Sequence, residues 1–400
     1  MRRPELDLLL TSMLEAEPEV SDLLFTVDRP LQVESFGALK AVPCEPPIAK
    51  LTPFQTETVA LNLIGDNPWH VADLLRHGSC DTSYTLGDKA RFRINIFSQR
   101  GTYSVVLRRL KTTIPTLDQL KFPAIIKEIP REKTGLILIT GATGSGKSTT
   151  LAAILNEINE SEPVHIVTLE DPVEFIHTHR KATFNQRELG TDFDNFSGGL
   201  RAALRQAPKV ILVGEMRDRE TVKIALSAAE TGHLVLSTLH TIDAGQTINR
   251  LLGMFEVEEQ EQLRARLAQA LRWVVSQRLV PKQGGGRYAL LEIMGASLRT
   301  QETIRLGESE GKSFYEIVEA SQPFGWRTFD LSCLEAFEQG QITEETALLH
   351  CTKRGAVARG MDALKKARGD RATELQALRM KNGRDPAQTG VQPLATLKFR

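Results

Sequence analysis

The sequence has few cysteines and no long apolar run. Its four cysteines, Cys44, Cys80, Cys333 and Cys351, lie far apart and form no Cys-x-x-Cys pair. That spacing argues against a zinc site and fits a reducing compartment. The opening stretch MRRPELDLLL lacks the apolar segment of a signal peptide, and no apolar run approaches the 18 or so residues of a membrane span. We therefore expect a soluble, cytoplasmic protein.

The sequence also lacks an excess of charge of either sign. Fifty Lys and Arg residues balance fifty Asp and Glu residues, and aromatic residues make up only 6% of the chain. A surface that binds nucleic acid usually combines a basic excess with aromatic side chains. The composition therefore speaks against nucleic acid as a partner.

Three regions can be distinguished along the 400 residues. Residues 1–112 carry short alternating segments around a helical stretch, which predicts a small α+β domain. In residues 113–355 strands and helices alternate, the pattern of an α/β domain with a mostly parallel sheet. Residues 356–400 are basic and have little apolar periodicity, so we expect a disordered tail, whose first part could extend as a helix.

The most informative stretch is GLILITGATGSGKSTT at residues 135–150. The apolar run 136–139 is short and uninterrupted, as in a strand buried on both faces. Three glycines then allow backbone N–H groups to turn towards an anion, and a helical pattern from Ser148 directs a helix N-terminus at the same point. A chance match to this motif lacks such a strand–loop–helix context. The stretch therefore predicts a phosphate loop that binds a nucleoside triphosphate.

Each polar residue of this loop has an expected task. Lys147 is placed to reach the β- and γ-phosphates, and the Ser148 hydroxyl is placed to bind Mg²⁺. The predicted nucleotide-binding residues are Thr143, Gly144, Ser145, Gly146, Lys147, Ser148 and Thr149. The expected ligands are ATP and Mg²⁺.

Polar side chains also end three further apolar strands. Glu170, Asp171 and Glu174 stand at the end of the stretch HIVTLEDPVEF. Glu215 stands near the end of KVILVGEMRD, and His240 near the end of GHLVLSTLHT. Ligands of open parallel sheets bind beyond the carboxyl ends of the strands, so these groups should lie beside the phosphate loop. Carboxylates there can hold Mg²⁺ or orient an attacking water.

Each of these residues alone could be a solvated loop charge or a hydrogen-bonded histidine, but several on one edge favour function. The predicted metal ligands are Ser148, Glu170 and Asp171. One position departs from the common pattern of phosphate-loop ATPases, because Gly214 precedes Glu215 where many of them have Asp. The acidic group on the preceding strand must then supply part of that charge, or the site is weakened.

Together these segments resemble the hexameric secretion ATPases and, within them, the PilT/PilU-like retraction motors of type IV pili. The resemblance covers residues 15 to about 352 and rests on GATGSGKST, LEDPVEF, NQRELG, LRQAPKVILVGEMRD, AAETGHLVLSTLHT, SQRLVP and GWRTFDLSCLEAFEQGQITEETALLH. It implies a PAS-like N-terminal domain, a RecA-like ATPase domain and a homohexameric ring with nucleotide between the domains. The implied function is ATP hydrolysis that powers pilus retraction and twitching motility.

The resemblance also implies roles for individual residues. It matches Glu215 to the catalytic glutamate of the family, and the acidic and histidine boxes to Glu170, Asp171, Glu174, His233 and His240. Arg91, Arg93 and Arg108 match arginines of the N-terminal domain near the nucleotide, although solvated strand charges are the plainer interpretation. The candidates for catalysis are Glu215, Glu174, Glu170, His240, Arg93 and Arg108. Lys209 replaces the family's usual Asp, which puts any contact of that Asp in doubt.

The expected partners follow from the same resemblance. They are further copies of the chain in a hexamer, an inner-membrane platform protein of the PilC type and a paralogous retraction ATPase, at the inner face of the inner membrane. The features lean towards the PilU-like branch, because SDLLF, VVLRRLKTTIPT and LRQAP fit PilU better, whereas GEMRD and STLHT fit PilT. Two alternatives remain: an assembly ATPase, which usually carries a tetracysteine insertion that is absent here, and a nucleotide-binding scaffold without significant hydrolysis.

Overall fold

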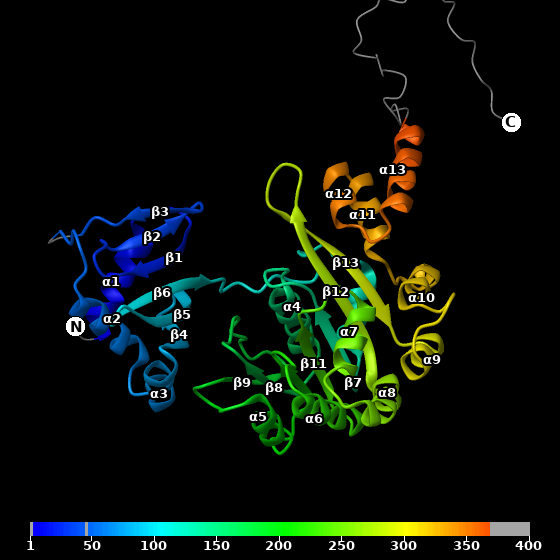
Figure 1. The fold of residues 1–400 in the computed structure, drawn as a ribbon, viewed down its shortest axis with the longest axis horizontal. Coiled ribbons are helices and arrows are strands. Elements are labelled where there is room, and N and C mark those ends of the chain that lie inside the picture. Colours follow the sequence, from blue (N-terminus) through cyan, green and yellow to red (C-terminus); the bar gives the residue numbers. More distant parts are fainter. Residues whose placement is uncertain (1–2, 45–46, 369–400) are drawn as a thin grey trace, which may run out of the picture.

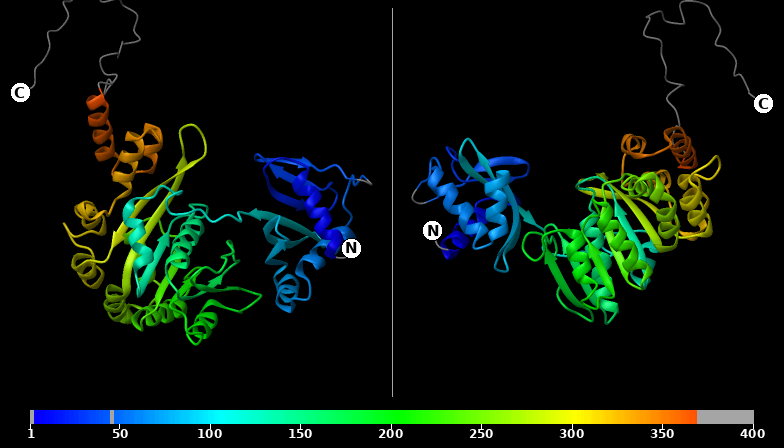
Figure 2. Two further views of the ribbon diagram at one scale, coloured as in Figure 1. Left: turned by 180° about the vertical axis from the view of Figure 1, so that it is seen from behind. Right: turned by 60° about the horizontal axis from the view of Figure 1, so that its bottom comes forward.

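A computed structural model describes residues 3–44 and 47–368, so most of the predicted tail lies outside the described residues. The chain forms two domains that are joined by an extended segment after residue 110 (Figure 1). Both further views show the N-terminal domain beside one end of the larger domain (Figure 2). The predicted α/β class with a separate N-terminal α+β domain is confirmed.

The N-terminal domain is a six-stranded antiparallel sheet of order β3-β2-β1-β6-β5-β4, packed against helices. Its elements are α1 (Arg3–Glu15), β1 (Val20–Phe25), β2 (Gln32–Ser35), β3 (Ala38–Ala41), α2 (Pro53–Ile64), α3 (Pro68–His77), β4 (Ser79–Leu86), β5 (Ala90–Gln99) and β6 (Thr102–Leu110). The local sequence sets the bounds of α3: the Asn67 side chain accepts the Trp69 N–H at 2.9 Å, and Gly78 ends the helix in a left-handed conformation.

The larger domain is built on a seven-stranded sheet of order β13-β12-β7-β11-β10-β8-β9, in which only β13 runs antiparallel to its neighbour. Its core elements are η1 (Ala124–Arg131), β7 (Gly135–Thr140), α4 (Lys147–Ser161), β8 (His165–Glu170), β9 (Thr183–Glu188), α5 (Phe196–Ala203), β10 (Val210–Val213), α6 (Arg219–Glu230), β11 (Leu234–Leu239), α7 (Ala244–Leu252), α8 (Val257–Ala270), β12 (Leu271–Pro281) and β13 (Arg287–Gly295). The elements that follow are α9 (Leu298–Leu306), α10 (Phe314–Ala320), η2 (Gln322–Phe324), α11 (Phe329–Glu338), α12 (Glu344–His350) and α13 (Arg354–Arg368).

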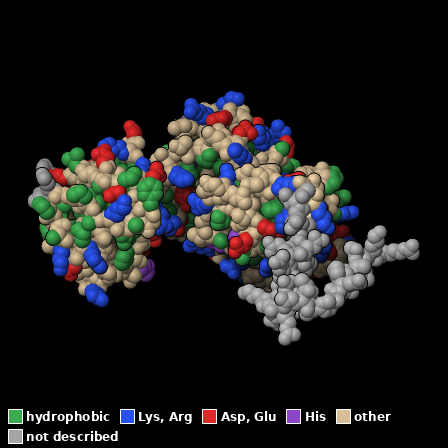
Figure 3. All heavy atoms as spheres, turned by 90° about the horizontal axis from the view of Figure 1, so that it is seen from above, with side chains coloured by type: hydrophobic (Ala, Val, Ile, Leu, Met, Phe, Trp, Pro, Cys, Tyr) green, Lys and Arg blue, Asp and Glu red, His purple; other side chains and the backbone are tan. Residues whose placement is uncertain are grey.

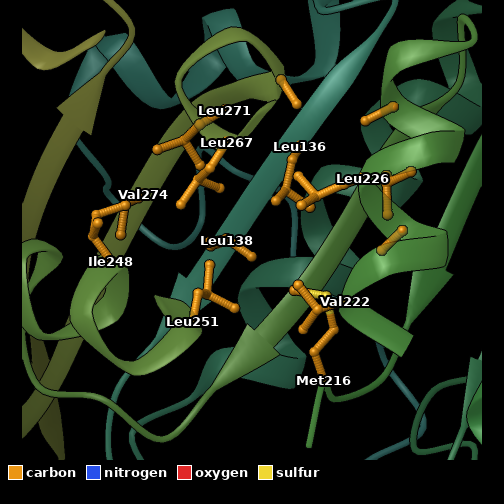
Figure 4. Packing of buried hydrophobic residues seen from close by; sticks show 14 of the residues in the cluster. Leu136, Leu138, Met216, Val222, Leu226, Ile248, Leu251, Leu267, Leu271 and Val274 are labelled. Carbon is orange, nitrogen blue, oxygen red and sulfur yellow. The ribbon is translucent and has the colours of Figure 1, made fainter. Parts of the chain in front are cut away.

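The central strand β7 shows why its sequence is apolar throughout. Successive residues of a strand face opposite sides of a sheet. Leu136 and Leu138 belong to the core under α5–α8, whereas Ile137 and Ile139 belong to the core under α4 and η1. Figure 4 shows the first of these cores, with the leucines of β7 facing side chains of α6 and α7. Burial on both faces thus fixes the strand from which the phosphate loop emerges.

Helix α13 lies across the predicted start of the tail. Val357 and Met361, four residues apart on one helix face, are fully buried against the core that α11 and α12 share with the β12–β13 hairpin. Residues 356–368 thus form the helix that the sequence allowed for the first part of the tail, instead of being disordered. A single i, i+4 pair, Val357 and Met361, is enough to anchor this helix.

In the part of the chain that the structure describes, no helix is both long and apolar enough to cross a membrane.

The packing of α13 can be tested with Met361→Ala, which leaves a cavity under the helix. Substitutions of this kind cost about 2–5 kcal/mol, so we expect the melting temperature of the protein to fall by several degrees. The exposed Lys366→Ala on the same helix is the control and should leave it unchanged. Equal melting temperatures for both variants would contradict the packing of α13.

Candidate nucleotide-binding site

A cavity of about 640 Å³ lies between the phosphate loop and the N-terminal domain. Its volume is in the usual range for a small-molecule site. Both domains line it, and the two lobes meet with basic and acidic side chains next to each other (Figure 3). The charged residues of its lining are Arg93, Arg108, Lys147, Glu170, Asp171, Glu174, Glu215, Arg217 and Arg287.

The phosphate loop joins β7 to α4 and packs directly on β12. A Cβ atom on Gly141 would come within 2.3 Å of the Gln277 carbonyl oxygen, and one on Gly146 within 2.8 Å of the Gln277 side-chain nitrogen. Both glycines also have positive φ, which other residues rarely adopt. The Gln277 side chain in turn accepts the Thr150 hydroxyl at 2.8 Å, which ties β12 to the first turn of α4. Glycine is therefore required here by contact as well as by backbone conformation.

Lys147 is folded over this loop. Its Nζ atom donates to the carbonyl oxygens of Gly141 and Ala142 at 2.8 and 3.0 Å. Burial lowers the pKa of the ammonium group, while Glu215 and Glu174 raise it. The cation is thus held at the loop, within the electrostatic reach of two carboxylates of the cavity.

The acidic segment at the end of β8 contributes two carboxyl groups whose pKa values are raised. Burial raises the pKa of Glu170 to about 7, although hydrogen bonds from Thr168 at 2.6 Å and Gln186 at 3.2 Å oppose the shift. Burial also raises the pKa of Asp171, and the nearby Arg93 and Arg217 lower it. Such perturbed groups in a cleft are typical of functional sites, and added positive charge would favour their ionised forms.

Glu215 follows β10 and is held between two basic side chains. The Arg217 Nε atom donates to one carboxylate oxygen at 2.8 Å, and the His240 Nε2 atom lies 3.4 Å from the other. The strand end itself is fixed, since the Thr238 hydroxyl donates to the Gly214 carbonyl at 2.7 Å. The glutamate therefore has a defined orientation at the sheet edge.

The structure gives a physical reason for Gly214. A Cβ atom at this position would lie 3.1 Å from the Leu169 carbonyl oxygen and 3.4 Å from the Glu170 Cα atom. Strands β8 and β10 are paired here, and the Gly214 N–H donates to the Leu169 carbonyl at 2.7 Å. An aspartate would press against the backbone of β8, and Glu170 supplies a carboxylate at the adjacent position.

Two arginines of the N-terminal domain reach the same cavity. Arg93 on β5 and Arg108 on β6 are paired across the sheet and both line it. The Arg108 Nε atom donates to the buried Asp22 at 2.9 Å, which steadies its side chain. Arg287, at the start of β13, lines the cavity from the other side and was missed by the sequence reasoning. A glycine run before it marks a hairpin tip, but no local pattern places that tip near the phosphate loop.

The structure therefore brings most of the predicted residues together. All predicted catalytic, nucleotide-binding and metal-binding residues line the cavity except Ser145, whose buried Oγ atom has no hydrogen-bond partner among the described residues. His233 lies elsewhere, before the start of β11, where its Nδ1 atom contacts the Ala228 carbonyl oxygen at 3.0 Å. Arg91 is also outside the lining and pairs with Glu188 instead. The roles of the lining residues stay predictions.

The close packing at Gly214 predicts the effect of adding a side chain. We expect Gly214→Ala to lower the melting temperature, because overpacking against a central strand costs about 1–3 kcal/mol. Gly214→Asp should lower it further, since it adds a carboxylate next to Glu170. Gly245→Ala, where a Cβ atom meets only ordinary contacts of 3.6 Å or more, is the matched control. A stabilised Gly214→Asp variant would refute this account of the missing aspartate.

Comparisons with known proteins agree with this geometry. A family model described as "Type II/IV secretion system protein" matches residues 78–394. The type IV pilus ATPase PilU of Pseudomonas aeruginosa is 38% identical over 86% of this chain and 88% of its own length. The type IV pilus retraction ATPase PilT of the same organism is 42% identical over 67% of this chain and 77% of its own.

A solved structure extends the likeness to three dimensions. The crystal structure of the pilus retraction motor PilT with bound ADP matches with a TM-score of 0.78 and 39% identity, over 88% of this chain and 98% of that one. Fold, sequence and the phosphate-loop cavity thus lead to one conclusion. The chain belongs to the type II/IV secretion system protein family and is a nucleotide-binding ATPase of its PilT/PilU branch.

Proposed function

We propose that this protein is an ATP-driven motor that powers retraction of a type IV pilus. The observation that carries the proposal is the single cavity in which a phosphate loop, a row of carboxylates and arginines of the N-terminal domain converge. Relatives that match most of this chain are named as pilus ATPases, pilus retraction ATPases or twitching motility proteins. These names support retraction, rather than extension, of the pilus.

Binding of the phosphates falls to the loop and to α4. Backbone N–H groups of the loop and the N-terminus of α4, which begins at Lys147, favour negative charge at this point. Lys147 adds a full positive charge, and the γ-phosphate would replace the loop carbonyls as the acceptor of its hydrogen bonds. This exchange is a specific consequence of the geometry at Gly141 and Ala142.

The metal site would use oxygen ligands. Ser148, Glu170 and Asp171 line the cavity and offer the hydroxyl and carboxylate oxygens that Mg²⁺ prefers. Over the described ranges, no group of three or more His, Cys, Asp and Glu side chains is arranged to hold a metal. Magnesium commonly needs only one or two carboxylates in addition to phosphate oxygens, so the residues fit it. When bound, Mg²⁺ would neutralise phosphate charge.

Hydrolysis would depend on Glu215. Its carboxylate can accept a proton from a water molecule or orient that water for in-line attack, with Arg217 and His240 holding the side chain. Glu174 lines the same cavity and is the second candidate for this task. Arg93 and Arg108, which approach from the N-terminal domain, would stabilise the charge that develops on the transferred phosphoryl group.

Because these arginines belong to a separate domain, their contact with nucleotide would link hydrolysis to domain movement. We propose that six copies form a ring in which such movements are combined. The expected partners are an inner-membrane platform protein of the PilC type and a paralogous retraction ATPase, with the ring at the inner face of the inner membrane. These assignments rest on the family resemblance.

Two other functions fit the site less well. An assembly ATPase would share the site, but all four cysteines of this chain are free and dispersed rather than gathered for zinc. A scaffold that binds nucleotide without hydrolysis would not need Glu215 fixed between Arg217 and His240. Retraction coupled to hydrolysis remains the proposal that the site supports best.

The assignment of the chemistry is tested by two substitutions. Lys147→Ala should abolish most ATP binding and all phosphate release, because it removes the only cation on the loop itself.

Glu215→Gln should retain binding but lose about 10²-fold or more of the hydrolysis rate, as expected for a positioned base. Lys133→Ala, which removes a surface ion pair with Glu162, is the control and should hydrolyse normally. If Glu174→Gln abolishes hydrolysis and Glu215→Gln does not, Glu174 is the base.

The direction of the motor is tested in cells. Deletion of the gene should leave excess surface pili and abolish twitching, because extension would continue without retraction. Complementation with the wild-type gene should restore both, whereas Glu215→Gln should not. Loss of pili on deletion would indicate an assembly ATPase, and full rescue by Glu215→Gln would indicate a scaffold.

A further inference from the structure

Apart from the hydrogen bond from Gln186 to Glu170, the segment NQRELG at residues 185–190 takes no part in the site described above. It ends β9, the edge strand of the large sheet, and Glu188 is the last residue of that strand. Strands β8 and β9 run parallel, and Glu188 is in register with Glu170. Glu188 thus stands beside the end of β8, where the acidic segment begins.

The contacts of Glu188 come from both domains. From the N-terminal domain, Arg91 Nη2 lies 3.0 Å from its Oε2 atom, and the Ser83 hydroxyl lies within 3.0 Å of both carboxylate oxygens. From its own domain, the Val173 N–H donates to the same Oε2 atom at 3.1 Å. One carboxylate therefore joins strands β4 and β5 to the loop that carries Glu174.

The pair is buried, unlike most ion pairs of this protein. The side chains of Arg91 and Glu188 are only 9% and 10% exposed, whereas those of Lys40 and Glu17 in the N-terminal domain are 40% and 30% exposed. An exposed pair contributes little, but removal of one partner from a buried pair leaves an uncompensated charge. Loss of either Arg91 or Glu188 should therefore be costly, because it would leave the charge of the other residue buried without a partner.

Two further contacts lie next to Glu188 along the boundary between the domains, and we call this set of interdomain contacts the seam. The Asn67 side chain donates to the Gly190 carbonyl at 3.0 Å, and the His70 Nε2 atom lies 3.4 Å from the Thr191 hydroxyl. Both N-terminal residues lie at the start of α3, which their own sequence fixes. These interdomain contacts thus involve the start of α3 and strands β4 and β5.

The seam is linked to the nucleotide cavity on both sides. Arg91 and Arg93 are two residues apart on β5 and so project from the same face of the strand; Arg91 contacts Glu188, and Arg93 lines the cavity. On the other side, Val173 stands next to Glu174, which also lines the cavity. A shift of the Glu188 contacts would move an arginine and a carboxylate of the site together.

We propose that Arg91 and Glu188 form an interdomain clasp that sets the position of Arg93 and of the acidic loop over the phosphate loop. Neither residue touches the nucleotide cavity, so both are positioning residues. The clasp deepens the proposed function and rests on it, because its task is to align the two halves of the hydrolytic site. It makes closure of the N-terminal domain a condition for rapid turnover.

The test compares Glu188→Gln, Arg91→Met and the double variant in the full-length protein. Glutamine keeps one oxygen that can accept the Val173 N–H, but it removes the charge and replaces the other carboxylate oxygen with an NH2 donor. Each single variant should bind a non-hydrolysable ATP analogue almost as well as the wild type but lose about 10- to 100-fold in kcat, as is usual for partners behind a reactive group. The double variant should be no worse than the poorer single one, because both remove the same contact.

The matched controls are Lys40→Met and Glu17→Gln, which break an ion pair within the N-terminal domain. They should keep the wild-type kcat. Losses in kcat that add in the double variant, or variants that melt earlier yet turn over normally, would overturn the clasp. The charge reversal Arg91→Glu with Glu188→Arg should not restore kcat, since arginine cannot accept the Val173 N–H. Restoration would show that the link to the acidic loop is unnecessary.

A second measurement does not depend on activity. Trypsin cleavage at the exposed Lys111, in the segment that joins the domains, should be faster in Glu188→Gln and Arg91→Met than in the wild type and the controls. Equal rates would overturn the clasp. If the wild type itself fails to hydrolyse ATP, the proposed function fails, and the cleavage rates still decide whether the clasp exists.

Discussion

The contact between the phosphate loop and β12 is the constraint on which the site depends. The loop lies so close to the backbone of Gln277 that any side chain at Gly141 would collide with it. This contact fixes the loop relative to the central strand β7, with which β12 is paired, and relative to α4 through Thr150. Glu170 and Glu215, at the ends of neighbouring strands of the same sheet, are thereby held beside the loop.

The electrostatic design of the cavity follows from its position between the domains. The sheet edge provides the carboxylates, and burial raises the pKa of Glu170 to about 7 and raises that of Asp171 as well. The opposite wall and the loop provide the cations, namely Arg93, Arg108 and Lys147. Cations brought by closure or by ligand would favour the charged carboxylates, so that the two halves of the site are mutually dependent.

The sequence predicted the parts of the site that have a local pattern of apolar and polar residues. It missed residues that come near the site only through contacts between distant segments of the chain. Strand β7 and helix α4 were predictable because burial on both faces and helical periodicity leave direct signatures. The shared edge of Glu170, Glu215 and His240 followed from the rule for parallel sheets. Arg287 could not be placed, because its hairpin tip comes near the cavity only through the pairing of β12 with β7. In the same way, the partner of Arg91 lies 97 residues along the chain.

The hairpin β12–β13 has a mechanical consequence. Its strands are paired without interruption from the Trp273–Gly295 pair to the Pro281–Arg287 pair, which should make the hairpin stiff. The outer part of the hairpin packs against α11–α13: Val280 and Leu290 belong to the core of these helices, and the Arg278 guanidinium stacks on the Phe329 ring. A force applied to these C-terminal helices would therefore be transmitted along the hairpin to Arg287, in the lining of the nucleotide cavity. The hairpin would act as a lever arm that strains the cavity by a route other than the phosphate loop.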